Sequence, residues 1–142
     1  MADIVVIDDE IAIRDLLCGV LEDAGHAVTG YSNGRAGIEH LKRERVDLLV
    51  TDIFMPEMEG LETIRRARAI EPELPIIAIS GGWSYGGDYL WVAQQFGALE
   101  TLKKPFLTRD LLAKVDALLG HDAVGAAGVL PRLSSRPFAA PR

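Results

Sequence analysis

Short apolar runs alternate along the chain with segments whose apolar residues recur at the spacing of a helix. Residues 3–7 form a β-branched run that is too uniformly apolar for a strand with one face in water. An apolar stripe at helical spacing follows and predicts a helix that Gly25 ends. The stripe consists of Ile13, Leu16, Leu17, Val20, Leu21 and Ala24. The opening of the chain therefore predicts a buried strand followed by a helix.

The same plan repeats as far as Gly120. Further strands are expected at residues 27–31, 46–51, 75–79 and 100–103. Further helices are expected at residues 34–44, 60–70 and about 87–96, and a last helix is capped by Thr108 and continues to Leu119. Five strand-then-helix units predict an α/β fold, in which helices cover both faces of a five-stranded parallel sheet.

Length and composition limit the chain to one domain and a tail. The 142 residues, 49% hydrophobic and 25% charged, suit a single soluble globular domain. We assign residues 1–120 to this domain and residues 121–142, rich in Ala, Gly, Pro and Ser, to a flexible tail. No apolar run approaches the roughly 20 residues that span a bilayer. Without a signal peptide pattern, and with Cys18 as its single cysteine, the chain is expected to be cytoplasmic and away from membranes.

Negative charge is concentrated in the predicted domain. The chain carries a formal charge of −6 and the tail carries +2, from three arginines against Asp122, which leaves −8 for residues 1–120. Nucleic-acid binding requires a basic surface, so we expect no direct contact with nucleic acid. An acidic domain suits a site that collects a divalent cation.

The polar residues at the strand ends are the candidates for chemistry, because an open parallel sheet binds ligands beyond the carboxyl ends of its strands. These residues are Asp8 and Asp9 after the first strand, Asp52 after the third, Ser80 after the fourth, and Lys103 and Lys104 after the fifth. Three clustered carboxylates raise each other's pKa values, and a hard cation such as Mg²⁺ relieves that cost.

These groups suffice for phosphoryl transfer to the protein. Such transfer needs an in-line nucleophile and neutralisation of the charge on the phosphoryl oxygens. Asp52 can supply the nucleophile as an aspartyl phosphate acceptor, while Lys104 and Ser80 hold phosphoryl oxygens by charge and by a hydrogen bond.

Several of these motifs resemble one family. Residues 6–10 (Val-Ile-Asp-Asp-Glu) are similar to the acidic opening of bacterial response-regulator receiver domains. Residues 52–60 resemble the family's D-x-x-M-P-x-M-x-G signature, Ser80 stands where the family keeps Ser or Thr, and residues 104–106 match its K-P-F motif. The resemblance covers about residues 2–120. It implies a flavodoxin-like sheet with strand order 2-1-3-4-5.

The resemblance also implies roles for single residues. Asp9 and Asp52 would bind Mg²⁺ through carboxylates, Asp8 would support the ion through water, and the backbone carbonyl of Phe54 would be a further ligand. Lys104, rather than Lys103, takes the family's lysine role because it directly precedes Pro105. A histidine kinase, a histidine phosphotransfer protein or a small phosphodonor would phosphorylate Asp52. The protein is then a switch rather than an enzyme, a monomer or weak phosphorylation-dependent dimer that binds an output protein when phosphorylated.

The chain departs from the family in three places, of which one is a tail without a recognisable output domain, so that a stand-alone receiver is expected. Thr101 stands three residues before the site lysine, where receivers usually carry Tyr or Phe, which puts the usual coupling of hydroxyl and aromatic ring in doubt. Ser80 and Lys104 are 24 positions apart, about two more than is common in the family, and the extra length falls in residues 81–87. Trp83 and Tyr85 in that loop either cover the core or contact a partner.

Two other functions remain as alternatives. A phosphorelay carrier or phosphate sink would use the same site without an output of its own. A Mg²⁺-dependent phosphohydrolase of the haloacid-dehalogenase type needs a second Asp two residues after the nucleophile, where this chain has Phe54, so this alternative is weak.

The remaining distinctive residues have simpler interpretations. Arg65, Arg66 and Arg68 are expected on a solvated helix face, and Cys18 is expected to pack beside the stripe of the first helix. His26, His40 and His121 share no metal-binding spacing, and His40 is expected at the surface.

Overall fold

Five parallel strands form one sheet in the part of the chain that the computed structural model describes, residues 1–53, 60–80, 93–95 and 97–120. The strands are β1 (Asp3–Ile7), β2 (Ala27–Tyr31), β3 (Leu48–Asp52), β4 (Ile76–Ser80) and β5 (Glu100–Lys103). Their order in the sheet is β2-β1-β3-β4-β5, as the resemblance implied.

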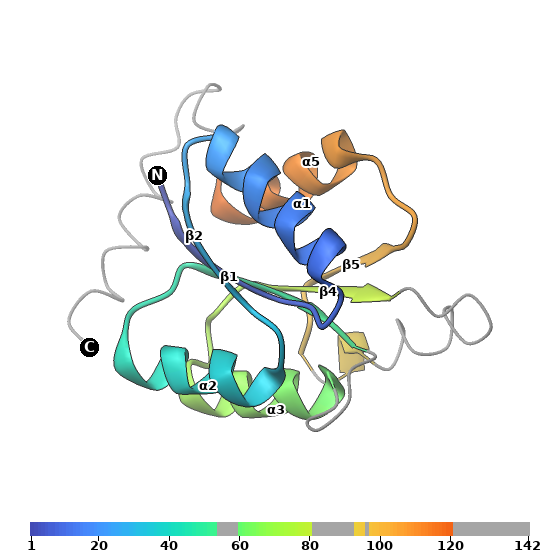
Figure 1. The fold of residues 1–142 in the computed structure, drawn as a ribbon. Coiled ribbons are helices and arrows are strands. Elements are labelled where there is room, and N and C mark those ends of the chain that lie inside the picture. The colour runs from blue at the N-terminus through green and yellow to red at the C-terminus, as the bar shows by residue number, and fades with distance from the viewer. Residues whose placement is uncertain (54–59, 81–92, 96, 121–142) are drawn as a thin grey trace.

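Helices cover both faces of this sheet. The helices α1 (Ile11–Asp23) and α5 (Thr108–Leu119) lie on one face, and α2 (Gly34–Arg43) and α3 (Gly60–Ile70) lie on the other (Figure 1). Side chains of a strand alternate between the two faces. In β1, Ile4 and Val6 pack in the core cluster that contains α1 and α5 residues, while Val5 and Ile7 pack in the cluster that contains α2 and α3 residues. This burial on both faces explains why β1, β3 and β4 are almost uniformly apolar, whereas β2 and β5 at the edges of the sheet are more exposed and carry polar residues.

The register of the strands brings the carboxyl ends of four strands to one edge of the sheet. Thr51 of β3 pairs with Ile7 of β1, and Asp52 pairs with Ile79 of β4. Ser80, the last residue of β4, pairs with Lys103 of β5. The residues that follow β1 and β5 therefore lie beside the ends of β3 and β4, which is what the predicted site requires.

Several element boundaries differ from the expected ones. The third strand begins at Leu48 instead of residue 46, and β4 extends to Ser80. The prediction that Thr108 caps the last helix is wrong, because the helix begins at Thr108 and the residue before it, Leu107, provides no side-chain cap. Gly120 ends that helix in the left-handed conformation, with a φ of 83°, as glycine does at helix ends.

The rest of the predicted organisation is covered only in part. Of the helix expected at about residues 87–96, only residues 93–95 are described, and they are helical. The expected tail at residues 121–142 lies outside the described residues. No helix among the described residues combines the length and the apolar character needed to cross a membrane.

The arginines of α3 divide into two groups. Arg65 and Arg66 are exposed and pair with Glu62, as expected for a solvated helix face. Arg68 is half-buried instead, and its guanidinium donates to the backbone carbonyl of Gly97 at 2.6 Å and to that of Pro72 at 2.8 Å. The expectation of a solvated side chain is wrong for Arg68, because carbonyls beyond its own helix accept its hydrogen bonds.

Candidate functional site

Asp52 lies at the carboxyl end of the central strand β3, where an apolar strand meets the polar edge of the sheet. Leu48, Leu49 and Val50 are fully buried, and they place the Asp52 carboxylate at the rim of the core with 4% of the residue exposed. The Nζ of Lys104 donates a hydrogen bond to Asp52 Oδ2 at 3.0 Å. A buried carboxylate with a directed cationic partner is thus present where the sequence predicted a nucleophile.

Lys104 joins the strand ends through both its backbone and its side chain. Its backbone N–H donates to the carbonyl of Ser80 at 2.7 Å, which fixes the chain after β5 beside the end of β4. Its Nζ lies 3.0 Å from Asp52 Oδ2, 3.1 Å from Asp8 Oδ2 and 3.1 Å from Glu10 Oε1. Burial by itself lowers the pKa of Lys104, but the charges of Asp52 and Asp8 and the hydrogen bond to Asp52 outweigh burial and hold the pKa above its ordinary value.

Asp8 is the most buried carboxylate of the site. It is fully buried directly after β1, and its Oδ1 accepts the backbone N–H of Glu10 at 2.9 Å. Its Oδ2 forms the ion pair with Lys104 and accepts no well-directed hydrogen bond from the described residues. An acceptor in this situation is costly to bury and is suited to a further cationic partner.

Glu10 joins the carboxylate cluster, whereas Asp9 does not. Asp8, Glu10 and Asp52 each place a carboxylate oxygen within 4.8 Å of the others, and Asp9 is exposed beside them. Glu10 is not among the site residues predicted from the sequence, although its place next to the two aspartates is a signal that could have indicated it. The role of Asp9 as a metal ligand stays a prediction.

The remaining predicted site residues have different positions. Ser80 is fully buried at the end of β4, next to the backbone of Lys104. Thr101 is half-buried in β5, where it pairs with Ala78 of β4. Phe54 and the loop with Trp83 and Tyr85 lie outside the described residues.

The donor set fits a hard divalent cation. Three carboxylates are balanced within the cluster by a single ammonium, and one buried oxygen of Asp8 has spare acceptor capacity. Mg²⁺ binds oxygen ligands and is usually held by one or two carboxylates, with water and phosphate oxygens completing its coordination. The cluster can therefore hold such an ion and receive a phosphoryl group beside it.

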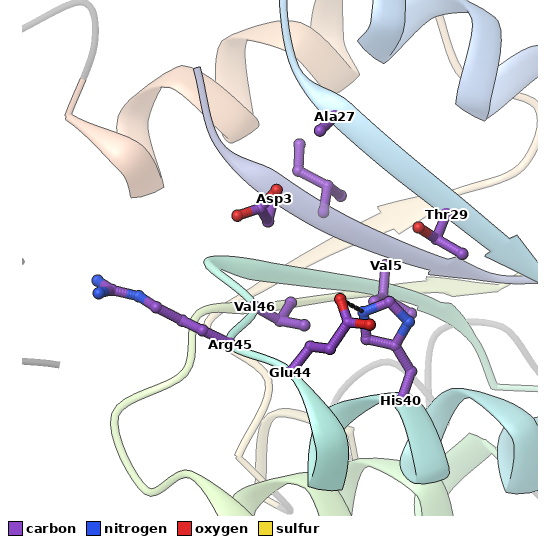
Figure 2. Close-up of a pocket in the computed structure, with 9 residues that line it drawn as sticks. Asp3, Val5, Ala27, Thr29, His40, Glu44, Arg45 and Val46 are labelled. Carbon is purple, nitrogen blue, oxygen red and sulfur yellow. Dashed lines mark ion pairs between the residues drawn. The ribbon is translucent and has the colours of Figure 1, made fainter. Parts of the chain in front are cut away.

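A separate cavity of about 260 Å³ lies at the other end of β1, away from Asp8. It is lined by residues of β1, β2, α2 and the segment that follows α2, which are Asp3, Ile4, Val5, Ala27, Thr29, His40, Glu44, Arg45 and Val46. In Figure 2 the side chains of His40 and Glu44 lie next to each other between α2 and the sheet. The cavity shares none of its lining residues with the carboxylate cluster.

The expectation that His40 lies at the surface is wrong. His40 is 8% exposed, and its Nδ1 forms a hydrogen bond of 2.8 Å with the Tyr31 hydroxyl. Its Nε2 lies 3.7 Å from Glu44 Oε1. Partners from β2 and from the end of α2 allow this polar ring to be buried. Cys18, in contrast, packs partly buried against the core as predicted, and burial raises the pKa of its thiol.

Comparison with known proteins identifies relatives of this chain. A family model described as the response regulator receiver domain matches residues 4–116. The chain is 38% identical to the response regulator receiver protein CpdR of Brucella abortus over 119 residues, which cover 84% of this chain and 98% of CpdR. It is also 34% identical to the response regulator MprA of Mycobacterium leprae over 116 residues. That match covers 82% of this chain but only 50% of MprA. The structure of the response regulator TrrA from Thermotoga maritima in complex with Mg²⁺–BeF matches with a TM-score of 0.75 and 31% identity, and the match covers 84% of this chain and all of TrrA.

Proposed function

Because the chain belongs to the family of response regulator receiver domains, which are phosphorylation-type signalling switches, we propose that its phosphoacceptor is Asp52 and that phosphorylation requires Mg²⁺. The observation that carries this proposal is the 3.0 Å hydrogen bond from Lys104 Nζ to the carboxylate of Asp52 at the end of the central strand. Asp8 and Glu10 complete an acidic cluster around that ammonium.

In the proposed reaction a carboxylate oxygen of Asp52 attacks the phosphorus of the donor. A new O–P bond forms while the bond from phosphorus to the leaving group breaks, and the leaving group takes that electron pair. The leaving group is the imidazole of a phosphohistidine, or acetate when acetyl phosphate is the donor. The product is an acyl phosphate on the protein.

Residues of this chain would stabilise the transferred group. The Lys104 ammonium already lies beside Asp52, so it can form a charge-assisted hydrogen bond to a phosphoryl oxygen. The Ser80 hydroxyl, at the end of the neighbouring strand, would donate a second one. Asp8, Asp9, Asp52 and the carbonyl of Phe54 are the proposed ligands of Mg²⁺, which when bound neutralises charge on the phosphoryl oxygens.

The proposed partners follow from this chemistry. A histidine kinase or a histidine phosphotransfer protein supplies the phosphoryl group, and the phosphorylated form binds an output protein as a monomer or weak dimer. We propose residues 1–120 as the receiver domain and expect it to work in the cytoplasm. The charge of −8 on these residues disfavours direct binding to nucleic acid.

The test is incubation with acetyl phosphate and Mg²⁺, followed by measurement of the intact mass. One added phosphoryl group is expected, which hydroxylamine removes and a chelator prevents. Asp52→Asn should abolish the modification. Asp23→Asn is the matched control, because Asp23 is an exposed carboxylate at the end of α1. Equal modification of the Asp52→Asn protein would refute the assignment.

A further inference from the structure

The three residues that link β1 to α1 carry two of the clustered carboxylates, so their backbone decides where those carboxylates lie. The N–H of Asp8 donates to the carbonyl of Tyr31 at 3.1 Å, and the N–H of Glu10 donates to Asp8 Oδ1 at 2.9 Å. Both bonds involve N–H groups of the link, so its carbonyl groups must be held by another residue.

Arg14 fixes the link at both of its ends. Its backbone N–H donates to the carbonyl of Glu10 at 2.9 Å, in the first turn of α1. Its side chain turns back, and Nη1 donates to the carbonyl of Asp8 at 2.8 Å. One residue thus holds the first and the last carbonyl of residues 8–10, and the bond to Asp8 is of the stronger, charge-assisted kind.

A glycine in β2 makes room for this side chain. A Cβ atom at Gly30 would lie 3.2 Å from Cγ and 3.3 Å from Cδ of Arg14, and 3.0 Å from Sγ of Cys18. Glycine inside a strand often marks such a close approach, although it is unfavourable for the strand itself. Gly30 and Arg14 therefore belong to one arrangement, in which the stem of the arginine packs close to β2 at Gly30.

We propose that Arg14 is a positioning residue that holds the Asp8–Glu10 link in the geometry needed to bind the divalent cation. The inference rests on the proposed function, since the cation is the one required for phosphorylation of Asp52. Arg14 acts through the backbone of Asp8 rather than on the phosphoryl group. Residues that orient ligands in this indirect way typically contribute about 10- to 100-fold to metal affinity or activity.

The direction in which Mg²⁺ affinity changes when the guanidinium of Arg14 is removed distinguishes a positioning role from a purely electrostatic one. Removal of a positive charge near a cation site should strengthen cation binding if only the electric field matters. Loss of positioning should weaken it. Arg14→Met keeps an unbranched side chain across Gly30 but removes the guanidinium, and Arg66→Met is the matched control on the exposed face of α3.

The first measurement is the Mg²⁺ concentration that gives half of the maximal phosphorylation rate with acetyl phosphate, in folded proteins well below their melting temperatures. Arg14→Met should raise this concentration about tenfold while the rate at saturating Mg²⁺ changes little, and Arg66→Met should leave both unchanged. Gly30→Ala should shift the concentration in the same direction because it displaces the arginine. In the Arg14→Met background Gly30→Ala should add almost nothing, which is the coupling expected of contacting residues.

A second measurement does not depend on phosphorylation. Amide hydrogen exchange over residues 8–10 without Mg²⁺ or phosphodonor should be about tenfold faster in Arg14→Met, with β4 unchanged. If the wild-type protein takes no phosphoryl group, the proposed function fails while this exchange still tests the bond of Arg14. An unchanged or lowered Mg²⁺ requirement in Arg14→Met, or additive effects of Arg14→Met and Gly30→Ala, would overturn the inference.

Discussion

Replacement of Lys104 by methionine should destabilise the domain strongly, and Mg²⁺ should reverse much of the loss. Lys104 is the cation among Asp8, Glu10 and Asp52, and its side chain is only 11% exposed. The side chains of Asp8 and Asp52 are 0% and 5% exposed, so water cannot replace the lost ammonium. The removal of one partner of a buried ion pair costs about 3–5 kcal/mol. We expect about 3 kcal/mol, because the exposed Glu10 can turn toward solvent.

The assay is thermal and urea unfolding of the wild type and of two lysine variants. A loss of 3 kcal/mol in a domain of this size lowers the melting temperature by about 10 °C. Lys103→Met is the matched control, because Lys103 is the preceding residue and is exposed. Its change should stay within about 0.5 kcal/mol.

Added Mg²⁺ should stabilise Lys104→Met more than the wild type, because in the variant the ion does not compete with the ammonium for the carboxylates. A ligand at 100 times its Kd stabilises the folded state by about 2.7 kcal/mol.

The pH dependence of the loss follows from the pKa of Lys104, which lies above its ordinary value in the folded protein. The contribution of the ammonium to the stability of the fold is therefore complete below about pH 10.4 and is lost as the pH rises through the folded-state pKa. The difference between wild type and variant should therefore stay constant from pH 7 to about pH 10 and shrink above it.

Two results would refute this account of Lys104. One is a loss below about 1 kcal/mol at pH 7, which would mean that the buried carboxylates do not need the ammonium. The other is an equal loss for Lys103→Met, which would locate the effect in the backbone of β5 rather than in the ion pairs.

Three further predictions concern other parts of the chain. Gly97→Ala should lower the free energy of unfolding, measured in urea, by about 1–3 kcal/mol, because the φ of 121° is unfavourable for alanine and the added Cβ would meet an arginine of α3. The control Gly19→Ala, in α1, has free space for the Cβ and should stabilise the protein slightly. An NMR titration should find the pKa of Glu62 at about 2, because hydrogen bonds from Arg65 and Arg66 lower it, and Arg65→Gln should raise this pKa. The stabilisation that these bonds give is present above about pH 4.3, the ordinary pKa of a glutamate, and is lost as the pH falls through 2. A protein that ends at Gly120 should keep the melting temperature and phosphorylation rate of the full chain, and a drop of several degrees would show that residues 121–142 pack on the domain.

The assembly of the site could be predicted because it follows from the ends of the strands. Asp52 and Ser80 end β3 and β4, and Asp8 and Lys104 directly follow β1 and β5. Once the strands are parallel and neighbours, their carboxyl ends lie at one edge of the sheet. The apolar runs that predict the strands therefore also predict which polar residues come together.

The choice between Asp9 and Glu10 could not be made in this way. The two residues are adjacent in a link that belongs neither to β1 nor to α1, so no periodicity assigns a direction to their side chains. Both residues are exposed, but Glu10 Oε1 lies 3.1 Å from Lys104 Nζ and belongs to the carboxylate cluster, whereas Asp9 does not. The hydrogen bonds of Arg14 to both ends of the link hold this geometry, and the path of its side chain to Asp8 passes beside Gly30 of β2.

The sequence by itself determined the order and type of the elements, the parallel sheet, and the gathering of Asp8, Asp52, Ser80 and Lys104, because these depend on local patterns and on the topology of repeated strand–helix units. Only the tertiary structure decided the burial of His40, the hydrogen bond from Arg68 to Gly97, and the inclusion of Glu10 in the cluster. A polar side chain is buried only where another element supplies its hydrogen-bond partner. Such partners lie far away in the sequence or across a short link, and their distances and directions are set when the helices pack against the sheet.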